Sequence, residues 1–406
     1  MPNTQLQQKV IRTLATAQVL NGLGVAGTVA AGSLLVSSVS NSETLAGLAQ
    51  TSSVLGAAAL ALPLARLTQI GGRRLALSMG LILGVIGSLL VISGGLNKNL
   101  YLILLGTFLV GAASASGYQA RFAAIDLATS QRSSQQLSFV VWGSTIGAVA
   151  GPNLMQPSGD LARKLGFPEL VGPYFISAIT LTLAAAVILI FLRPDPYLTA
   201  NKLSSEKQKQ ITNKLALKHI LSNKLARFAI AAMTVGHVAM VSVMVMTPIH
   251  MAHVDVTLRI IGIVISIHVL GMYAFSPVVG LVSDRIGGVA TIKIGLATLL
   301  ISSVIAGTSP AGDAIRLGVG LFLLGLGWSC TLIAGSTLLS QSVELNFKSA
   351  SQGASDLVMN LAGAGGGAVA GVIIATLSYG WLCLIASIPV AYLALTSLKL
   401  KPGLLK

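Results

Sequence analysis

The chain has 406 residues, of which 54% are hydrophobic and only 9% are charged, and its mean hydropathy is +0.83. Soluble globular domains carry about 25% charged residues, so this composition excludes an ordinary soluble protein and predicts an integral membrane protein. The net charge of +15 could suggest a nucleic-acid ligand. The basic residues lie in short loops between apolar runs, however, and no nucleic-acid partner is expected.

Twelve apolar runs follow one another along the chain, and each is close to the ~20 residues that a helix needs to cross a bilayer. Backbone groups in lipid must be hydrogen-bonded within the protein, so these runs predict helices. The sequence therefore predicts an all-α integral membrane protein whose twelve transmembrane helices form two pseudo-symmetric six-helix bundles. The expected spans are residues 12–36, 44–67, 74–96, 100–128, 137–155, 171–192, 226–249, 260–282, 289–307, 315–343, 350–377 and 381–398.

The two halves of the chain carry related features at a constant spacing of 216 residues. The Gly71-Gly72 pair falls on Gly287-Gly288, and the glycine-rich segment 147–151 falls on segment 363–367. An internal repeat of this kind is typical of transporters. The domain organisation that follows is an N-terminal six-helix bundle at 1–193, a cytoplasmic linker at 194–224 and a C-terminal bundle at 225–406.

Basic residues are distributed unevenly between the two sides of the predicted bundles. With the N-terminus in the cytoplasm, 21 of the 26 Lys and Arg residues lie on the cytoplasmic side. Because cytoplasmic loops are enriched in basic residues, this asymmetry predicts a multi-pass protein of the plasma membrane, such as a bacterial inner membrane, with both termini in the cytoplasm. The five basic residues on the other side are Lys98, Arg163, Lys164, Arg259 and Arg316.

A short loop motif follows the predicted eighth span, where residues 280–288 read GLVSDRIGG. It resembles the cytoplasmic loop motif of the major facilitator superfamily, which runs Gly, three residues, Asp, Arg, one residue and Gly. The matching residues are Gly280, Asp284, Arg285 and Gly287. A degraded copy follows the predicted second span, with Leu64, Thr68 and Gln69 in place of the Gly, Asp and Arg, followed by Gly71, Arg73 and Arg74.

A glycine motif lies in the predicted fifth span. Gly147, Gly151 and Pro152 match the start of the pattern found in the drug:proton antiporter branch of that superfamily, while Met155 and Gln156 replace its last two glycines. Ordinary close packing of helices through small residues is the other interpretation of these glycines. The resemblance covers nearly the whole chain, and it implies the twelve-helix fold of the superfamily and, through this motif, export.

The resemblance also assigns roles at the cytoplasmic loops. It implies that Asp284 meets the start of the fifth span near Ser133 and Ser134, where the helix dipole favours negative charge. It further implies that basic loop residues reach acids at helix ends, such as Asp126 or Glu344, and that these contacts hold the outward-facing state and break when the transporter changes conformation. The alternative is a solvated loop whose charges only set the orientation. The residues assigned to this conformational gate are Gly280, Asp284, Arg285, Gly287, Arg73, Arg74 and Asp126.

In the superfamily, the first, fourth, seventh and tenth helices line a central cavity for the substrate. Under the spacing of 216 residues, Asn21 falls on His237, which places both near the pseudo-two-fold axis where substrate sites tend to lie. The residues assigned to the substrate cavity are Gln18, Asn21, Tyr118, Arg121, His237, Trp328 and Asn360.

Three residues of the predicted spans are candidates for carrying a proton. Asp356 lies well inside a span, where an isolated carboxylate is strongly disfavoured and protonation relieves the cost. We expect Arg121, at a similar depth, to approach Asp356 in one conformation and to leave it in another. His237 and His268 are candidates because an imidazole ordinarily titrates near neutral pH. The alternatives are structural: a neutral, hydrogen-bonded histidine that packs its helix, which is the favoured interpretation of His268, and for Asp356 a pairing with a neighbouring helix.

These features predict a secondary active transporter that works by alternating access, and most simply a proton-coupled exporter of small amphiphilic or drug-like molecules. One alternative is proton-coupled uptake of a metabolite or a soft metal ion, because Met233, His237, Met240 and Met244 share one helix face. Another is a membrane receptor that keeps the fold without transporting. The expected partners are a small-molecule substrate, protons and the lipid bilayer. The protein is expected to be a monomer, and the proton gradient is expected to drive transport. The sequence contains no motif for an enzyme, a cofactor or a bound metal.

Overall fold

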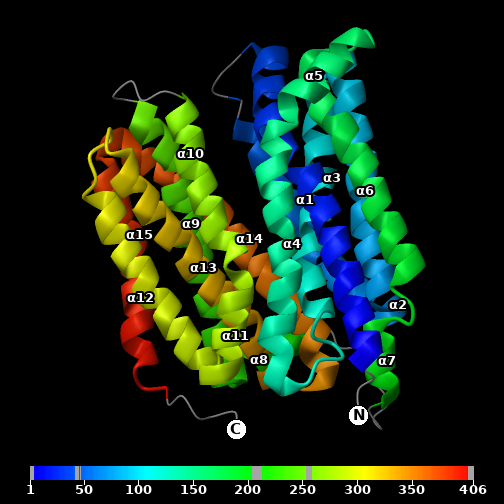
Figure 1. The fold of residues 1–406 in the computed structure, drawn as a ribbon, viewed down its shortest axis with the longest axis vertical. Coiled ribbons are helices and arrows are strands. Elements are labelled where there is room, and N and C mark those ends of the chain that lie inside the picture. The colour runs from blue at the N-terminus through cyan, green and yellow to red at the C-terminus, as the bar shows by residue number, and fades with distance from the viewer. Residues whose placement is uncertain (1–3, 42–44, 46, 204–212, 253–257, 401–406) are drawn as a thin grey trace. The chain divides into compact units, whose positions relative to one another are not determined.

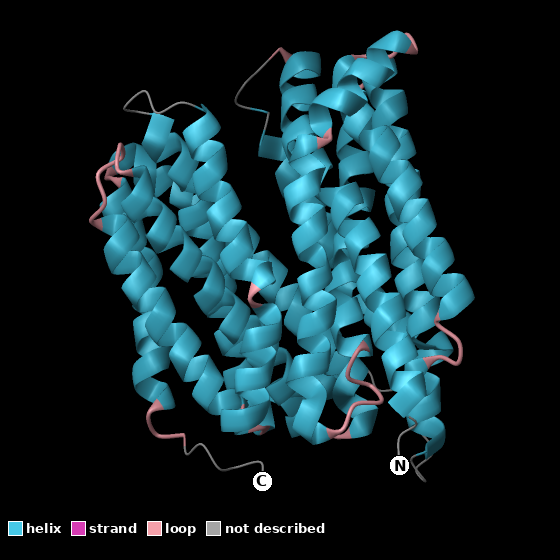
Figure 2. Cartoon of the chain, viewed as in Figure 1, coloured by secondary structure: helices cyan, strands magenta, loops and turns pink. Residues whose placement is uncertain are grey.

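The structure of the protein is a computed structural model that describes residues 4–41, 45, 47–203, 213–252 and 258–400. Within these residues every regular element is a helix (Figure 2), as the apolar runs predict. Two elements are short 3-10 helices, η2 (Ser130–Arg132) and η3 (Glu169–Val171), and a third, η4 (Leu270–Ala274), is a π-helix. The α-helices in chain order (Figure 1) are α1 (Thr4–Ser40), α2 (Gly47–Leu96), α3 (Leu100–Ala123), α4 (Ser133–Asn153), α5 (Met155–Lys164), α6 (Gly172–Phe191), α7 (Pro196–Leu203), α8 (Asn213–Ser222), α9 (Lys224–Ala252), α10 (Leu258–Val269), α11 (Ser276–Ile286), α12 (Gly288–Gly307), α13 (Ala314–Ser342), α14 (Leu345–Thr376) and α15 (Tyr379–Ser397).

Ten helical stretches of the described chain are long and apolar enough to cross a membrane, and the bent pair α4 and α5 raises the number to eleven. The helix α2 has 50 residues, which corresponds to about 75 Å, more than twice the ~30 Å hydrocarbon core of a bilayer. Gly72 interrupts it with φ 81° and ψ 179°, between the predicted spans 44–67 and 74–96. When α2 is counted as two spans, all twelve predicted helices have a place in the structure.

The helices divide into two compact units. Unit one consists of residues 1–128, 143–216 and 345–357, and unit two consists of residues 129–142, 217–344 and 358–406. The helices α4 and α14 therefore each contribute one part to each unit. The predicted bounds of the two bundles and of the linker, whose residues 204–212 lie outside the described chain, remain predictions, as does the cytoplasmic side of the termini.

Glycines allow α4 and α1 to touch through their backbones in unit one. A Cβ atom on Gly147 would lie 2.4 Å from the carbonyl carbon of Gly22, and a Cβ atom on Gly151 would lie 2.8 Å from the backbone nitrogen of Gly27. Small residues at such positions are what bring helices together in lipid, where apolar surfaces gain little from leaving the solvent. Gly147 and Gly151 of the predicted motif thus lie at a close helix contact, and Pro152 follows in the last turn of α4.

Candidate functional site

Unit one contains two buried pairs of opposite charge, and the first joins α3 to α14. Nη2 of Arg121 donates to Oδ1 of Asp356 at 2.5 Å, and the two side chains are only 2% and 1% exposed. The guanidinium carbon also lies 4.5 Å from the ring centre of Phe122 and 5.6 Å from that of Tyr118. The approach of Arg121 to Asp356, which their depth in the sequence predicts, is confirmed in this structure.

Asp356 reaches α3 because the first turns of α14 pack one face against α2. The hydroxyl of Ser349 donates to the carbonyl oxygen of Ala65 at 2.7 Å. A Cβ atom on Gly353 would lie 2.4 Å from that of Ala65, so glycine permits the close contact. Ser349, Gly353 and Asp356 are four and three residues apart and share a helical face. The small residues of this contact therefore set how near the carboxylate comes to α3.

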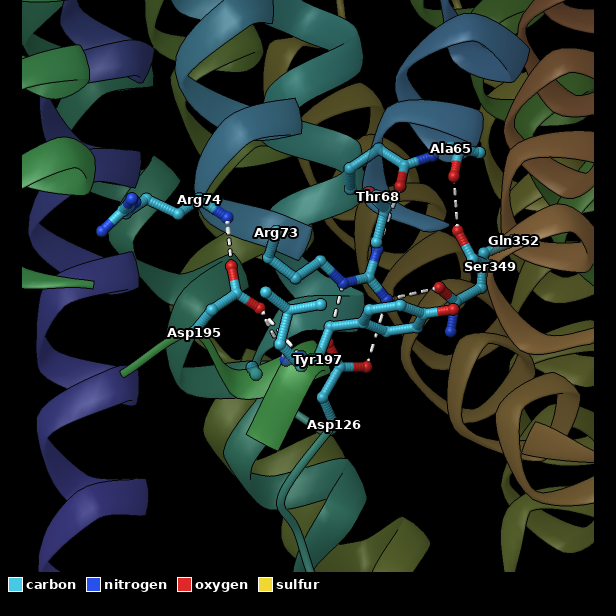
Figure 3. A network of polar contacts seen from close by, with 12 residues as sticks. Ala65, Thr68, Arg73, Arg74, Asp126, Asp195, Tyr197, Ser349 and Gln352 are labelled. Carbon is cyan, nitrogen blue, oxygen red and sulfur yellow. Dashed lines mark hydrogen bonds and ion pairs between the residues drawn. The ribbon is translucent and has the colours of Figure 1, made fainter. Parts of the chain in front are cut away.

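The second buried pair is formed by Arg73, the first residue after Gly72, and Asp126 (Figure 3). Nε and Nη2 of Arg73 donate to Oδ2 and Oδ1 of Asp126 at 2.7 and 3.1 Å, the two-point geometry that a guanidinium and a carboxylate favour. Nη1 donates to Oε1 of Gln119 at 3.1 Å, and Nη2 donates to Oε1 of Gln352 at 2.6 Å. Burial raises the pKa of the Asp126 carboxyl, and the Arg73 charge opposes that rise. Arg73 thus fastens α14 to α2 and α3.

The backbone directly after this arginine is held by Asp195 (Figure 3). Its Oδ2 accepts from the backbone N–H of Arg74 at 2.7 Å, and its Oδ1 accepts from the N–H groups of Tyr197 and Leu198 at 3.0 and 3.1 Å in the first turn of α7. Gly72 has a φ of 81°, and a Cβ atom there would lie 2.5 Å from the Asp195 carboxylate. Only glycine meets both conditions, so this turn directs the Arg73 side chain inward and joins α2 to α7.

The glycines with positive φ indicate a different alignment of the two loop motifs from the constant spacing of 216 residues. Gly287 has a φ of 90° and Gly72 a φ of 81°, whereas Gly71 is helical. The counterpart of Gly287 is therefore Gly72, at a spacing of 215 residues. The predicted alignment of the first-half copy is wrong by one position, because two adjacent glycines leave the register open in the sequence. The corrected counterparts of Gly280 and Asp284 are Ala65 and Gln69.

In unit two, Asp284 binds the N-terminus of α4. Its Oδ1 accepts from the backbone N–H of Ser134 and its Oδ2 from that of Gln135, both at 2.9 Å. The free N–H groups and the dipole of a helix N-terminus favour a carboxylate there, so the contact that the motif predicts is confirmed. A Cβ atom on Gly280 would lie 2.7 Å from the carbonyl oxygen of Ser134, so α11 and α4 nearly touch. Arg285 is exposed.

Two of the predicted cavity residues of unit one, Gln18 and Asn21, lie against Gly117 of α3. A Cβ atom on Gly117 would lie 2.6 Å from Nδ2 of Asn21 and 3.3 Å from the amide of Gln18. The Gln18 amide donates to the Ser144 hydroxyl at 2.9 Å, and the Asn21 amide donates to the Ala113 carbonyl oxygen at 3.2 Å. Two carboxamides therefore line a small cavity of about 10 Å³, room for about one water molecule.

Two of the predicted cavity residues of unit two, His237 and Trp328, belong to an aromatic cluster. Nε1 of Trp328 donates to Nδ1 of His237 at 3.1 Å, and the ring of Tyr273, in the π-helix η4, meets Trp328 edge-on at 5.7 Å. A Cβ atom on Gly363 would lie 2.5 Å from Cδ2 of His237, so glycine leaves room for the imidazole. Asn360, one turn earlier on α14, is 3% exposed. These side chains offer stacking and hydrogen-bonding groups rather than net charge.

His268 is completely buried and packs α10 against α13. Its Nδ1 lies 2.7 Å from the carbonyl oxygen of Leu321, and a Cβ atom on Gly325 would lie 2.5 Å from the His268 carbonyl oxygen. A ring nitrogen that donates to a backbone carbonyl fixes the tautomer and orientation of a neutral imidazole. The geometry thus favours the structural interpretation of His268 over its assignment as a proton carrier.

The sequence profile of the Major Facilitator Superfamily matches residues 14–367. The chain belongs to this superfamily. It is therefore a multi-pass membrane protein and a secondary transporter, and not an enzyme. Its fold agrees with that of solved members: the E. coli fucose:proton symporter superposes with a TM-score of 0.73 at 15% identity, over 95% of this chain and 97% of the symporter.

Two relatives in bacteria extend over much of the chain. The "Uncharacterized MFS-type transporter YdeG" of Bacillus subtilis is 35% identical over 385 residues, which are 94% of this chain and 90% of that protein. The "Riboflavin transporter RfnT" of Brucella anthropi is 26% identical over 270 residues, 66% of this chain and 65% of that protein. The relationships to known members thus agree on transport across a membrane.

Sequence reasoning missed four residues of the charged network, namely Gln119, Gln352, Asp195 and Tyr197. Gln119 precedes Arg121 by two residues, and Gln352 precedes Asp356 by one helical turn. A carboxamide inside a predicted span, close in sequence to a charged residue, is a signal that could have found both. The pairing of Asp195 with the loop at Gly72 has no such signal, because the two segments are more than 120 residues apart.

Replacing Arg73 with Lys is expected to lower the thermal stability of the protein. Lysine keeps the charge but lacks the planar fork that reaches Asp126, Gln119 and Gln352 together. Hydrogen bonds to charged groups contribute about 1.5–3 kcal/mol each, so the loss is several kcal/mol. The matched control is Arg74→Lys, because Arg74 contributes a backbone N–H that the substitution retains. Thermal unfolding in detergent measures both variants, and equal Tm values would contradict the role given to Arg73.

Proposed function

We propose that the chain is a proton-coupled exporter of small amphiphilic molecules, in which Asp356 carries the exchanged proton and Arg121 is its counter-ion. The observation that supports this assignment is the buried ion pair between α3 and α14. Ionisable side chains are rare within membrane spans and mark ion or proton pathways. The Asp356 carboxyl group can bind and release a proton, and the Arg121 guanidinium, 2.5 Å away, can neutralise its charge when the proton is absent.

The pair works as a switch because its two states differ in charge. While Arg121 contacts Asp356, the positive charge of the guanidinium neutralises the carboxylate, which therefore stays deprotonated. When the guanidinium leaves, an isolated carboxylate in a medium of low dielectric is costly, and uptake of a proton from the accessible side relieves it. Return of the arginine then displaces the proton. Coupling of this alternation to access from the two sides of the membrane gives exchange of protons for substrate.

The direction of transport is inferred from the glycine motif of α4. Gly147 and Gly151, which match the start of the antiporter-branch motif, lie at the contact with α1, and the Trp328 and Tyr273 rings form an apolar aromatic cluster in unit two. Aromatic and amphipathic groups of this kind suit bulky, weakly polar compounds better than small hydrophilic ones.

Proton-coupled uptake of a metabolite is the second candidate function. It is favoured by the relative in Brucella anthropi, whose name gives riboflavin as its substrate. Residues around Gly117 and Trp328 could serve either direction, since carboxamides and aromatic rings bind heteroaromatic metabolites as well as drugs. In the soft-metal form of this alternative, two of the methionines on which it rests, Met233 and Met240, are buried in the packing of unit two.

Asp356→Asn is expected to abolish transport driven by a pH gradient. The variant keeps the size and polarity of the side chain but cannot exchange a proton. Proteoliposomes of both orientations, with an imposed pH gradient and with ethidium or riboflavin as probe, measure coupling and direction together. Asp160→Asn, which changes an exposed acid paired with Arg163, is the matched control and should transport normally. Uphill, pH-dependent transport by the Asp356→Asn variant, or no transport of ethidium by the wild type, would refute the proposal.

We also propose that Asp284 acts as a conformational gate by holding α11 on the N-terminus of α4. Asp284→Asn removes the charge that the helix dipole stabilises, which is worth about 0.3–1 kcal/mol at an exposed terminus and more when half-buried. We expect a several-fold lower transport rate with little change in substrate affinity, because the residue biases conformations and does not touch the ligand. Asp313→Asn removes a comparable carboxylate at the start of α13 and is the control; equal rates for the two variants would contradict the gate.

A further inference from the structure

Gln119 lies between the two buried ion pairs and contacts both. It is only 1% exposed. Its Oε1 accepts from Nη1 of Arg73 at 3.1 Å, and its Nε2 lies 3.4 Å from Oδ2 of Asp356, toward which it donates. One carboxamide on α3 thus links the Arg73–Asp126 pair to the Arg121–Asp356 pair. A network of this kind couples its members, because each hydrogen bond orients the next.

The orientation of this amide is dictated by the charges on its two sides. A guanidinium can only donate, and an ionised carboxylate can only accept. The amide of Gln119 satisfies both partners only with its oxygen toward Arg73 and its nitrogen toward Asp356, which is the arrangement in the structure. The fit therefore depends on Oδ2 of Asp356 acting as an acceptor, as it does in the ionised carboxylate.

We propose that Gln119 is a positioning residue that transmits the protonation state of Asp356 to Arg73. This inference rests on the proposed function, since it takes Asp356 as the proton carrier. The relay requires the proton to bind Oδ2, the oxygen that faces Gln119, where it places an O–H donor against the amide N–H. Turning the amide over would satisfy the carboxyl group but would place its NH2 group against the guanidinium of Arg73. In either arrangement one side of the carboxamide loses its hydrogen bond.

Loss of this hydrogen bond weakens the attachment of the first turns of α14. Arg73 holds this segment through Gln352, whose Oε1 accepts from Nη2 at 2.6 Å and which precedes Asp356 by one helical turn. Loss of the Gln119 contact leaves the guanidinium with a weaker set of acceptors and frees it to move. Protonation of Asp356 thereby loosens the attachment of residues 345–357 to α2 and α3, and proton binding is converted into a conformational change.

Several other groups could contribute to a pH response in this region. On the neighbouring elements, Arg121, Tyr118 and Arg73 face Asp356. The charged and titratable side chains around Arg73 are Asp126, Asp195, Tyr197 and Lys348. Variants that change Asp356 and Gln119 separately distinguish their effects from those of the neighbouring acids.

The test is hydrogen–deuterium exchange of residues 345–357 in the full-length protein in nanodiscs, measured between acidic and neutral pH and corrected for the chemical exchange rate. In the wild type we expect faster exchange at acidic pH. Gln119→Met, which keeps the volume but cannot hydrogen-bond to both pairs, should remove this pH dependence. Gln341→Met, which removes a part-buried carboxamide that donates to the Ser133 hydroxyl in unit two, should behave like the wild type. Gln119→Asn replaces the methionine variant where the latter does not fold.

The outcomes separate this inference from the proposed function. If Asp356→Asn removes the pH dependence and Gln119→Met retains it, the relay is wrong while Asp356 remains the proton carrier. Faster exchange of the Gln119 variant at every pH, with the pH dependence intact, would show a merely structural role and would also refute the relay. If Asp356→Asn retains the pH dependence, another acid titrates, and both proposals fail. A wild type without pH dependence refutes the relay, and transport by Asp356→Asn then decides the proposed function.

Discussion

The buried ion pair between Arg121 and Asp356 is the interaction on which the account of this transporter depends. Two charges removed from water inside a membrane protein carry a large desolvation cost, which their mutual attraction offsets only when the geometry is good and further hydrogen bonds are present. Such a pair adds little to stability compared with well-packed apolar residues. Its presence in the first turns of α14, together with the Arg73–Asp126 pair beside it, is therefore best explained by a function that uses the charges.

The two loop motifs form comparable helix contacts by different chemistry. In unit two, the carboxylate of Asp284 binds the N-terminus of α4, and a glycine on α11 allows the close approach. In unit one, the corresponding positions are Ala65 and Gln69, the glycine lies on the opposite helix as Gly353, and Arg73 supplies the fastening. The repeat thus conserves the close helix contact and the glycine with positive φ, while the charge that holds the contact has changed sign.

Much of this arrangement is predictable from the sequence, and there are physical reasons why the other features are not. The helical spans follow from hydropathy, the approach of Arg121 to Asp356 follows from their depth in two spans, and the Asp284 contact follows from the motif. The alignment of the first loop motif with the second cannot be predicted from the sequence, because only the structure shows which of Gly71 and Gly72 has the positive φ. Gln119 and Gln352 could have been found as carboxamides inside spans, close in sequence to Arg121 and Asp356, but their partners on other helices could not, because an uncharged amide does not identify the residue to which it hydrogen-bonds.

The central claim is that the Arg121–Asp356 pair is kept for proton coupling and not for stability. The most direct measurement combines Arg121→Met with Asp356→Leu and compares the double variant with each single variant in thermal unfolding and in gradient-driven transport. Removing one partner leaves an uncompensated buried charge, whereas replacing both with apolar residues of similar volume is often neutral or stabilising. The account predicts a double variant as stable as the wild type and without pH-driven transport. A double variant that still couples transport to the pH gradient, or one less stable than both single variants, would contradict it.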